Sequence, residues 1–298
     1  MTRPISMRML LPYGLLLACG GTLLPAAVAQ EERPATADDD EPDQTLQQWR
    51  KLYRQVMGEW SVKRAGEEPV RLTLKDEPVM YWSSLNDFNG SVFVFTHAGK
   101  PELIGTVFSF SHSSPPPARR VMCEFQSLSE HELQLLGPDR PRRVLRSGYQ
   151  AARLDETVPV PTNRQLLRAQ AKQLAGRYSS HMTFEEKRWE LRLLPNPIFQ
   201  YEPDAKSETS DACLIQCLFA FVGLLTDPEV LLLVEARRTK QGAEWVYQPL
   251  RFSNRPLFVE FDGTPVWESA GPGSDESSRG YLLDRSRLMT LENLKRGQ

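Results

Sequence analysis

The chain contains an internal repeat, which constrains the fold more than any other feature of the sequence because each copy has to form the same structure. Residues 49–61 match residues 167–179 in residue type at seven positions, and the two members of each pair lie 118 residues apart. Residues 72–82 match residues 191–201 in the same way at an offset of 119. Ordered agreement at glycine, proline and aromatic positions favours an internal duplication over a chance match of common apolar residues.

The match continues with offsets that change only between predicted elements. Three further pairs of segments agree, at offsets of 126, 127 and 122: residues 93–95 with 219–221, 101–103 with 228–230, and 125–126 with 247–248. Surface connections tolerate insertions better than the elements that they join. The sequence therefore predicts two tandem lobes whose loops have drifted in length.

Each copy begins with a helical pattern and continues with strand patterns. Apolar residues recur at three- and four-residue spacing over residues 44–57 and 162–175, which predicts one helix per copy. Alternating or continuous apolar runs predict six strands in each copy. The predicted strands cover residues 70–74, 79–82, 92–96, 103–110, 121–126 and 132–136, and residues 189–194, 198–201, 214–222, 230–237, 244–250 and 257–261.

These patterns predict a strand-rich α+β fold. Glycine and proline within residues 96–102 and 223–229 favour hairpin turns, so consecutive strands should pair antiparallel. The economical architecture is two similar tandem lobes, each with one N-terminal helix and a curved antiparallel sheet of about six strands. The expected boundaries are a signal peptide at 1–29, a leader at 30–43, lobe 1 at 44–145, a linker at 146–161, lobe 2 at 162–268 and a C-terminal tail at 269–298.

The N-terminus has the pattern of a bacterial export signal. Arg3 and Arg8 precede a nearly uncharged apolar stretch that ends in the small residues 27–29, so cleavage after Ala29 is expected. The following leader contains seven acids and no large apolar residue, and such a segment cannot bury enough surface to fold alone. We therefore expect an exported protein, either periplasmic or secreted.

A second processing route stays open in the same segment. Residues 16–20 resemble a lipobox, in which Cys19 would become lipidated and form the new N-terminus. In that case the leader would tether the lobes to a membrane as a lipid-anchored envelope protein. Without lipidation, no membrane contact is expected.

The chain offers few residues with the spacing of a known catalytic or metal site. The four histidines, His97, His112, His131 and His181, show no paired metal-ligand spacing, and no nucleophile elbow or phosphate-binding glycine loop is present. We therefore expect no cofactor and no metal. A net charge of −2 likewise argues against nucleic acid as a partner.

Carboxylates within apolar strands and matched turns are the remaining candidates for acid–base chemistry. Glu124 and Glu235 lie in predicted strands, where burial would raise their pKa. Glu102 and Glu229 follow a proline at the same position of each copy, so they either record a shared turn geometry or line a shared cleft. The geometric interpretation is the simpler one.

Three cysteines remain after cleavage behind Ala29: Cys123, Cys213 and Cys217. An odd number leaves at least one thiol without an intramolecular disulfide partner. If Cys213 and Cys217 share a strand, their α-carbons lie roughly 13 Å apart, which is too far for a disulfide.

Several segments together resemble a family of exported bacterial proteins of unknown function. They are residues 191–201, residues 218–238 with the turn at 226–229, Trp245 and Trp267. The resemblance covers most of the mature chain and implies no activity. Gly58 and Trp60 also resemble the Gly-x-Trp entry of lipocalin-like barrels, which implies a sheet that curls around an apolar ligand.

Two functional hypotheses follow. The first is a non-catalytic binding or structural module of the periplasm or envelope, whose sheets take an apolar ligand or an envelope protein. The second is a secreted hydrolase that uses Glu124, Glu235 or the pair Glu102 and Glu229.

Overall fold

Two helices and eighteen strands make up the part of the chain that the computed structural model describes. The described residues are 41–84, 87–112, 118–138, 141–154, 158–203, 213–223, 225–271, 280–290 and 292. Residues 42–298 form a unit separate from residues 1–41. The predicted signal peptide, Cys19 and nearly all of the acidic leader lie outside the described residues.

Both predicted helices are confirmed, with ends that shift by a few residues. Helix α1 (Glu41–Gly58) buries one apolar stripe, which consists of Trp49, Leu52, Tyr53, Val56 and Met57. Helix α2 (Arg164–Ala175) buries Leu167, Ala171, Leu174 and Ala175. Asn163 precedes α2, and its side-chain oxygen accepts hydrogen bonds from the backbone N–H groups of Gln165 and Leu166 at 2.8 and 3.3 Å. These two bonds pair two backbone N–H groups that have no partner within the first turn of the helix.

One six-stranded sheet and one three-stranded sheet are built mainly from strands between α1 and α2. The six-stranded sheet has the order β18-β6-β5-β4-β2, with β3 also paired to β4. Its strands are β2 (Thr73–Leu74), β3 (Met80–Ser83), β4 (Asn89–His97), β5 (Lys100–His112), β6 (Ala118–Ser127) and β18 (Tyr281–Met289). The smaller sheet has the order β1-β7-β8 and contains β1 (Ser61–Arg64), β7 (Leu133–Leu136) and β8 (Arg143–Leu145).

One nine-stranded sheet is built mainly from strands that follow α2. Its order is β17-β16-β10-β11-β13-β14-β15-β9, and β12 pairs with β13 beside this path. The strands are β9 (Ala152–Arg153), β10 (Tyr178–Phe184), β11 (Lys187–Leu193), β12 (Phe199–Tyr201), β13 (Cys213–Val222), β14 (Pro228–Thr239), β15 (Gly242–Arg251), β16 (Leu257–Phe261) and β17 (Thr264–Ser269). Within each of the three sheets, every pairing between named strands is antiparallel. The expected strand-rich antiparallel architecture is thus confirmed.

The predicted hairpins are present, but other parts differ from the expectation. The turn between β4 and β5 and the turn between β13 and β14 lie inside residues 96–102 and 223–229. Residues 281–289, expected in a C-terminal tail, form β18 and pair with β6. Residues 152–153, expected in a linker, form β9 at the edge of the nine-stranded sheet. The larger sheet therefore exceeds the six strands expected for one lobe.

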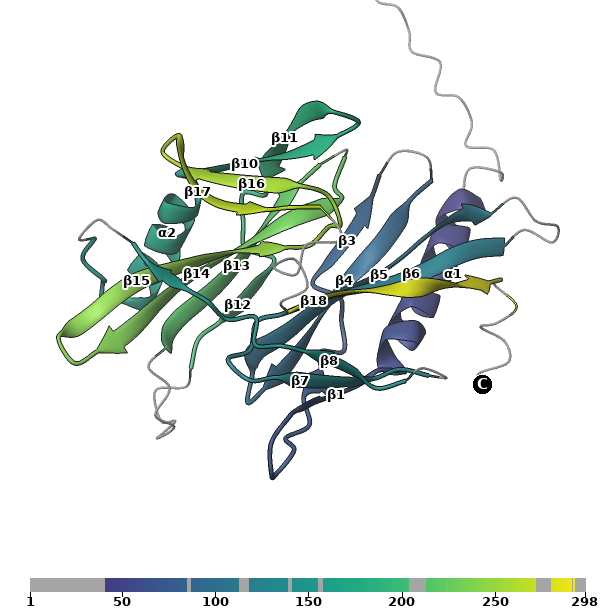
Figure 1. Ribbon diagram of the computed structural model, residues 1–298, viewed down its shortest axis with the longest axis horizontal. Helices are drawn as coiled ribbons and strands as arrows, with labels where there is room; N and C mark the ends of the chain where they lie inside the picture. The colour runs from purple at the N-terminus through teal and green to yellow at the C-terminus, as the bar shows by residue number, and fades with distance from the viewer. Residues whose placement is uncertain are drawn as a thin grey trace, which may run out of the picture. The chain divides into compact units, whose positions relative to one another are not determined.

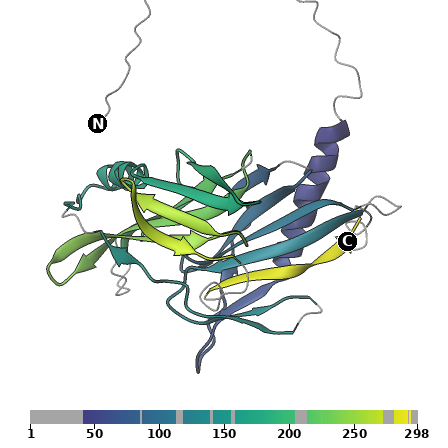
Figure 2. The same cartoon turned by 45° about the horizontal axis from the view of Figure 1, so that its top comes forward.

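Each long hairpin buries both of its faces, because successive side chains of a strand point to opposite sides. In β4 and β5, Phe93, Phe95 and Leu103 face a core that includes α1. In β13 and β14, Phe219, Phe221, Val230 and Leu232 face a second core that includes α2. Figures 1 and 2 show α1 in purple along one sheet and α2 in teal beside the other.

The opposite faces of these hairpins meet in a third core. Val92, Val94 and Ile104 from the six-stranded sheet cluster with Leu218, Ala220, Leu231 and Leu233 from the nine-stranded sheet. The six-stranded and nine-stranded sheets therefore pack against each other through their central strands. Among the described residues, no helix combines the length and apolar composition needed to cross a bilayer.

We expect Leu231→Ala to destabilise the protein strongly, because its side chain is 0% exposed in the core between the sheets. Truncating such a leucine removes buried methyl groups and leaves a cavity, and should lower the free energy of unfolding by about 2–5 kcal/mol. Leu166→Ala is the matched control, since Leu166 is 59% exposed. Urea unfolding measures both variants, and similar small losses would contradict the packing of the sheets.

Candidate functional site

We compare three cavities of more than 300 Å³, each lined by described residues. The first, of about 890 Å³, is the largest of these three and is called the large cavity. The second, of about 310 Å³, is the aromatic cavity because five aromatic side chains line it. The third, of about 330 Å³, is the amide cavity because three glutamines line it. The six-stranded and the nine-stranded sheets both contribute residues to each of them.

The large cavity has a mixed polar and aromatic lining. Its walls come from the turn between β4 and β5, the loop before β7, and strands β12, β13 and β14. Tyr149, Phe199 and Tyr201 supply flat apolar surface, and the predicted candidates Glu102 and Glu235 also line it. A cavity of this kind suits a ligand with both a flat face and hydrogen-bonding groups.

Glu102 is committed to a buried ion pair. Its side chain is 3% exposed and accepts a hydrogen bond from Arg64 Nε at 2.8 Å and a second from Arg64 Nη2. Ser129 Oγ donates to the same carboxylate at 3.0 Å. A bidentate guanidinium contact of this kind is strong and directional. Glu102 therefore holds the loop before β7 against β5.

Glu235 is a second buried acid of the large cavity, with 4% of its surface exposed. Gln216 Nε2 donates to its carboxylate at 3.0 Å. Burial raises the pKa of Tyr149, and the negative charge of Glu235 raises it further. The side-chain oxygen Oε1 of Gln216 is buried and accepts no hydrogen bond from any described residue. One buried acceptor beside the Glu235 carboxylate is thus without a partner in the described part of the chain.

The aromatic cavity contains a different set of side chains. Its walls are Trp82, Phe88, Phe108, Phe110 and Phe252. The rings of Phe88 and Phe110 stack with centroids 4.7 Å apart, and those of Trp82 and Phe108 lie 5.8 Å apart. Three carboxylic acids, Glu124, Asp227 and Glu229, line the same space.

The three acids of the aromatic cavity hold protons more tightly than ordinary carboxylic acids. Burial raises the pKa of Glu124 to about 8, the hydrogen bond that Tyr281 donates opposes this shift, and the charge of Glu229 adds to it. Burial also raises the pKa of Asp227 and of Glu229, and the charge of Glu229 raises that of Asp227 further. Glu124 can therefore donate a proton near neutral pH, or exchange it for another cation.

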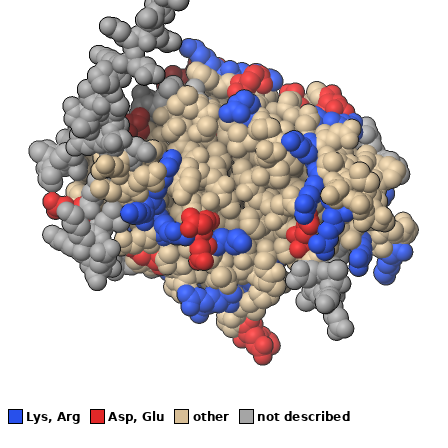
Figure 3. All heavy atoms as spheres, turned by 180° about the vertical axis from the view of Figure 1, so that it is seen from behind, with Lys and Arg blue, Asp and Glu red and all other residues tan. Residues whose placement is uncertain are grey.

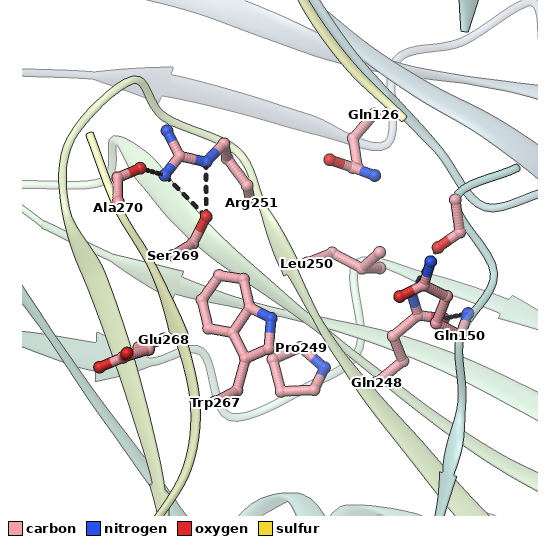
Figure 4. Close-up of a pocket in the computed structure, with 11 residues that line it drawn as sticks. Gln126, Gln150, Gln248, Pro249, Leu250, Arg251, Trp267, Glu268, Ser269 and Ala270 are labelled. Carbon is pink, nitrogen blue, oxygen red and sulfur yellow. Dashed lines mark hydrogen bonds between the residues drawn. The ribbon is translucent and has the colours of Figure 1, made fainter. Parts of the chain in front are cut away.

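The polar groups of the amide cavity mainly bind one another (Figure 4). The backbone N–H of Gln150 donates to Gln248 Oε1 at 2.9 Å. Arg251 Nε and Nη2 donate to Ser269 Oγ at 3.0 and 2.7 Å. Burial lowers the pKa of Arg251, whereas the neighbouring Glu124 raises it. These contacts give the amide cavity a mainly structural role, and its arginine adds positive charge near the aromatic cavity.

The structure sorts the four predicted carboxylates into two cavities. Glu102 and Glu235 line the large cavity, whereas Glu124 and Glu229 line the aromatic cavity. Glu102 and Glu229 therefore line no common cleft, in keeping with the simpler geometric interpretation. Sequence reasoning missed Asp227, although it stands two residues before Glu229 in the turn that leads into β14.

The histidines and cysteines do not gather into a site. His97 and His131 line the large cavity, whereas His181 stacks on Phe258 with ring centroids 4.6 Å apart. Among the described residues, no group of three or more histidine, cysteine or acidic side chains is arranged to hold a metal ion.

Cys213 and Cys217 both lie on β13, which begins one residue before the predicted strand, and neither they nor Cys123 form a disulfide. Burial raises the pKa of the Cys217 and Cys123 thiols to about 12. At that pKa a thiol is almost entirely protonated near neutral pH, so neither side chain has the character of a nucleophile.

Charged side chains of both signs lie on the face that Figure 3 shows. Acidic and basic side chains of the described residues stand near one another there, around a wide area of other residues.

Comparison with protein-family models, curated proteins and solved structures found no match for this chain. The resemblance to exported bacterial proteins and the lipocalin-like Gly-x-Trp pattern stay predictions.

We expect Glu124 to make the stability of the protein depend on pH. The folded chain keeps the Glu124 proton up to about pH 8, whereas an unfolded chain releases it near pH 4.5. Between these values the folded state binds more protons, so the contribution of Glu124 to stability falls as the pH rises. Between pH 5 and pH 9, the free energy of unfolding of the wild type should fall by about 1 kcal/mol or more relative to that of Glu124→Gln.

Chemical unfolding at a series of pH values measures this difference. Glu190→Gln is the control, because the Glu190 side chain is 65% exposed on β11, and it should follow the wild type. Parallel curves for the wild type and Glu124→Gln would contradict the burial of a protonated Glu124.

Proposed function

We propose that this protein is an exported, non-catalytic ligand-binding module of the periplasm or cell envelope, built from two similar lobes. Its ligand is a small polar molecule with a flat group, and it occupies the large cavity. The observation that carries this proposal is a space of about 890 Å³ that combines three aromatic side chains with the buried Glu235.

The order of strand pairing supports two similar lobes. After α1, β1 pairs with β7 and β7 with β8, and after α2, β10 pairs with β16 and β16 with β17. Strands β2 and β3 both pair with β4, as β11 and β12 both pair with β13. The ladder between β10 and β11 corresponds to a single β-bridge, between Lys63 and Arg71, in the first part of the chain. The sheets of three and six strands thus follow the path of the nine-stranded sheet.

The register of the strands supports the same proposal. Val92 lies opposite Met80 in one sheet, and Leu218 lies opposite Phe199 in the other. Leu218 comes 126 residues after Val92, and Phe199 comes 119 residues after Met80. Both offsets equal those of the sequence repeat. The last segment differs. The strand pairing relates β6 to β15 with an offset of 124 residues, whereas the sequence match of the same segments has an offset of 122. A shift by two residues keeps the same side chains on the same face.

The covered sheets favour a cavity as the binding site. The central strands β4, β5, β13 and β14 are packed against a helix-containing core on one face and against each other on the opposite face. An apolar ligand or an envelope protein would find no open apolar face on these four strands. The ligand is therefore expected inside the large cavity.

Export supports the proposed location but depends only on the N-terminal sequence. The arginines, apolar stretch and small residues before Gln30 have the pattern of a cleaved signal. Lipidation of Cys19 would place the same lobes at a membrane surface, and cleavage after Ala29 would release them.

We expect Tyr201→Ala and Glu235→Gln to weaken ligand binding at least tenfold, because the two side chains supply a flat face and a buried acceptor. A chain that starts at Gln30 is tested by calorimetry against nucleosides, aryl glycosides and aromatic amino acids. Tyr81→Ala is the matched control, since Tyr81 is 44% exposed and lies outside the cavity. Absence of binding throughout the panel, or equal affinity in all variants, would contradict the proposal.

A further inference from the structure

Glu102 and Glu229 occupy the same local structure in the two halves of the chain. The backbone N–H of Leu128 donates to the carbonyl oxygen of Glu102 at 2.8 Å, and that of Phe252 donates to the carbonyl oxygen of Glu229 at 3.0 Å. Both glutamates lie within the first three residues of a long strand just after the hairpin turn, Glu102 in β5 and Glu229 in β14.

The loops beside the two glutamates also correspond. Ser129 donates to Glu102, and a hydrogen bond from Ser253 lowers the pKa of Glu229. The hydroxyl oxygen of each serine accepts a hydrogen bond from the backbone N–H two residues later, at 3.1 Å from His131 and 3.4 Å from Arg255. The structure therefore contains two carboxylates with the same support.

The two carboxylates differ in their cationic partner. Arg64 binds Glu102 through two guanidinium nitrogens. The repeat offset of 118 places Met182 at the position that corresponds to Arg64. In the described part of the chain, no lysine or arginine lies within ion-pair distance of Glu229, which is 4% exposed. A guanidinium group thus binds Glu102, whereas the corresponding carboxylate, Glu229, has no such partner among the described residues.

The aromatic cavity lies beside this second carboxylate. It offers about 310 Å³ lined by five aromatic rings, and Asp227 and Glu124 contribute two more carboxyl groups. Asp227 forms no side-chain hydrogen bond with any described residue. Aromatic faces attract cations because their quadrupole is negative above the ring, and the attraction strengthens where water is excluded.

We propose that the aromatic cavity binds a small organic cation, an ammonium or guanidinium group on an apolar body, with the charged group beside Glu229. The rings of Trp82, Phe88 and Phe108 enclose the apolar body. This site is separate from the large cavity and does not depend on the ligand proposed there. A metal ion is a poor alternative, because the acidic side chains in the described residues do not form a metal-binding group.

The charges that face the cavity favour exchange of a proton for a cation. Two arginines lie near the acids. Arg255 lines the aromatic cavity, and its positive charge acts against the burial that raises the pKa of Asp227 and Glu229. Arg251 acts in the same way on Glu124, and both arginines have other contacts. Arg251 donates to Ser269 and to the carbonyl of Ser253, and the Arg255 guanidinium lies 3.7 Å from the centre of the Phe184 ring.

Tyr281 is the remaining titratable group at this site, and it donates to Glu124. A bound monovalent cation would displace one proton from the group formed by Glu124, Asp227 and Glu229, so affinity should increase as the pH rises from 6 to 8.5.

Calorimetry with benzylamine and benzylguanidine tests the proposal, with benzyl alcohol as the neutral probe of similar shape. Both cations should bind at least tenfold more tightly than the alcohol. Glu229→Gln should weaken them at least tenfold, and Glu235→Gln in the large cavity should leave them unchanged. Phe88→Leu keeps every charge and should weaken both cations about threefold or more, which gives a second answer if Glu229→Gln fails to fold.

The opposite results would overturn the proposal. They are equal affinity for benzyl alcohol and benzylamine, no binding of either cation by the wild type, or wild-type affinity in both Glu229→Gln and Phe88→Leu. A loss of cation binding in Glu235→Gln alone would place the cation in the large cavity and would also overturn the proposal. Failure of the panel of polar ligands in the large cavity leaves these outcomes unaffected.

Discussion

The packing of one sheet against the other is the interaction on which the rest of this structure depends. Strands β4 and β5 bury one face against the core of α1, and β13 and β14 bury one face against the core of α2. Their remaining faces are apolar, with residues such as Val94, Ile104 and Leu231, and would be exposed to water if the sheets were apart. Burial of such surface stabilises a protein by about 25 cal/mol per Å². Each hairpin therefore needs the other to bury its second apolar face.

The same packing explains where the cavities lie. The central strands fit closely because their side chains are aliphatic, whereas polar and aromatic residues surround the two turns that follow β4 and β13. At one turn Glu102 is neutralised by Arg64, and the cavity beside it has a mixed polar lining. At the other turn Glu229 has aromatic neighbours and two further acids. Two similar turns thus present different chemistry to solvent.

The sequence predicts the helices and the long hairpins because local spacing determines them. It does not predict β18, since the charged residues of Tyr281–Met289 suggest a loop and only pairing with the distant β6 makes them a strand. The candidate site divides in the same way. Apolar neighbours identified Glu124 and Glu235 as buried acids, but the contact of Glu124 with Tyr281 spans 157 residues of sequence. Asp227 was missed because an acid in a turn is ordinarily solvated, and only the arrangement of the two sheets brings it to a cavity.

Native-state hydrogen exchange tests most directly whether the six-stranded and the nine-stranded sheets both depend on one buried interface. If β4, β5, β13 and β14 share their core, their slowest amides should exchange with the same free energy, equal to that of global unfolding. Leu231→Ala should lower that free energy equally in all four strands, although Leu231 belongs to only one of them. Exchange of β13 and β14 at a clearly lower free energy than β4 and β5 would show that the two sheets unfold independently, and would contradict this account.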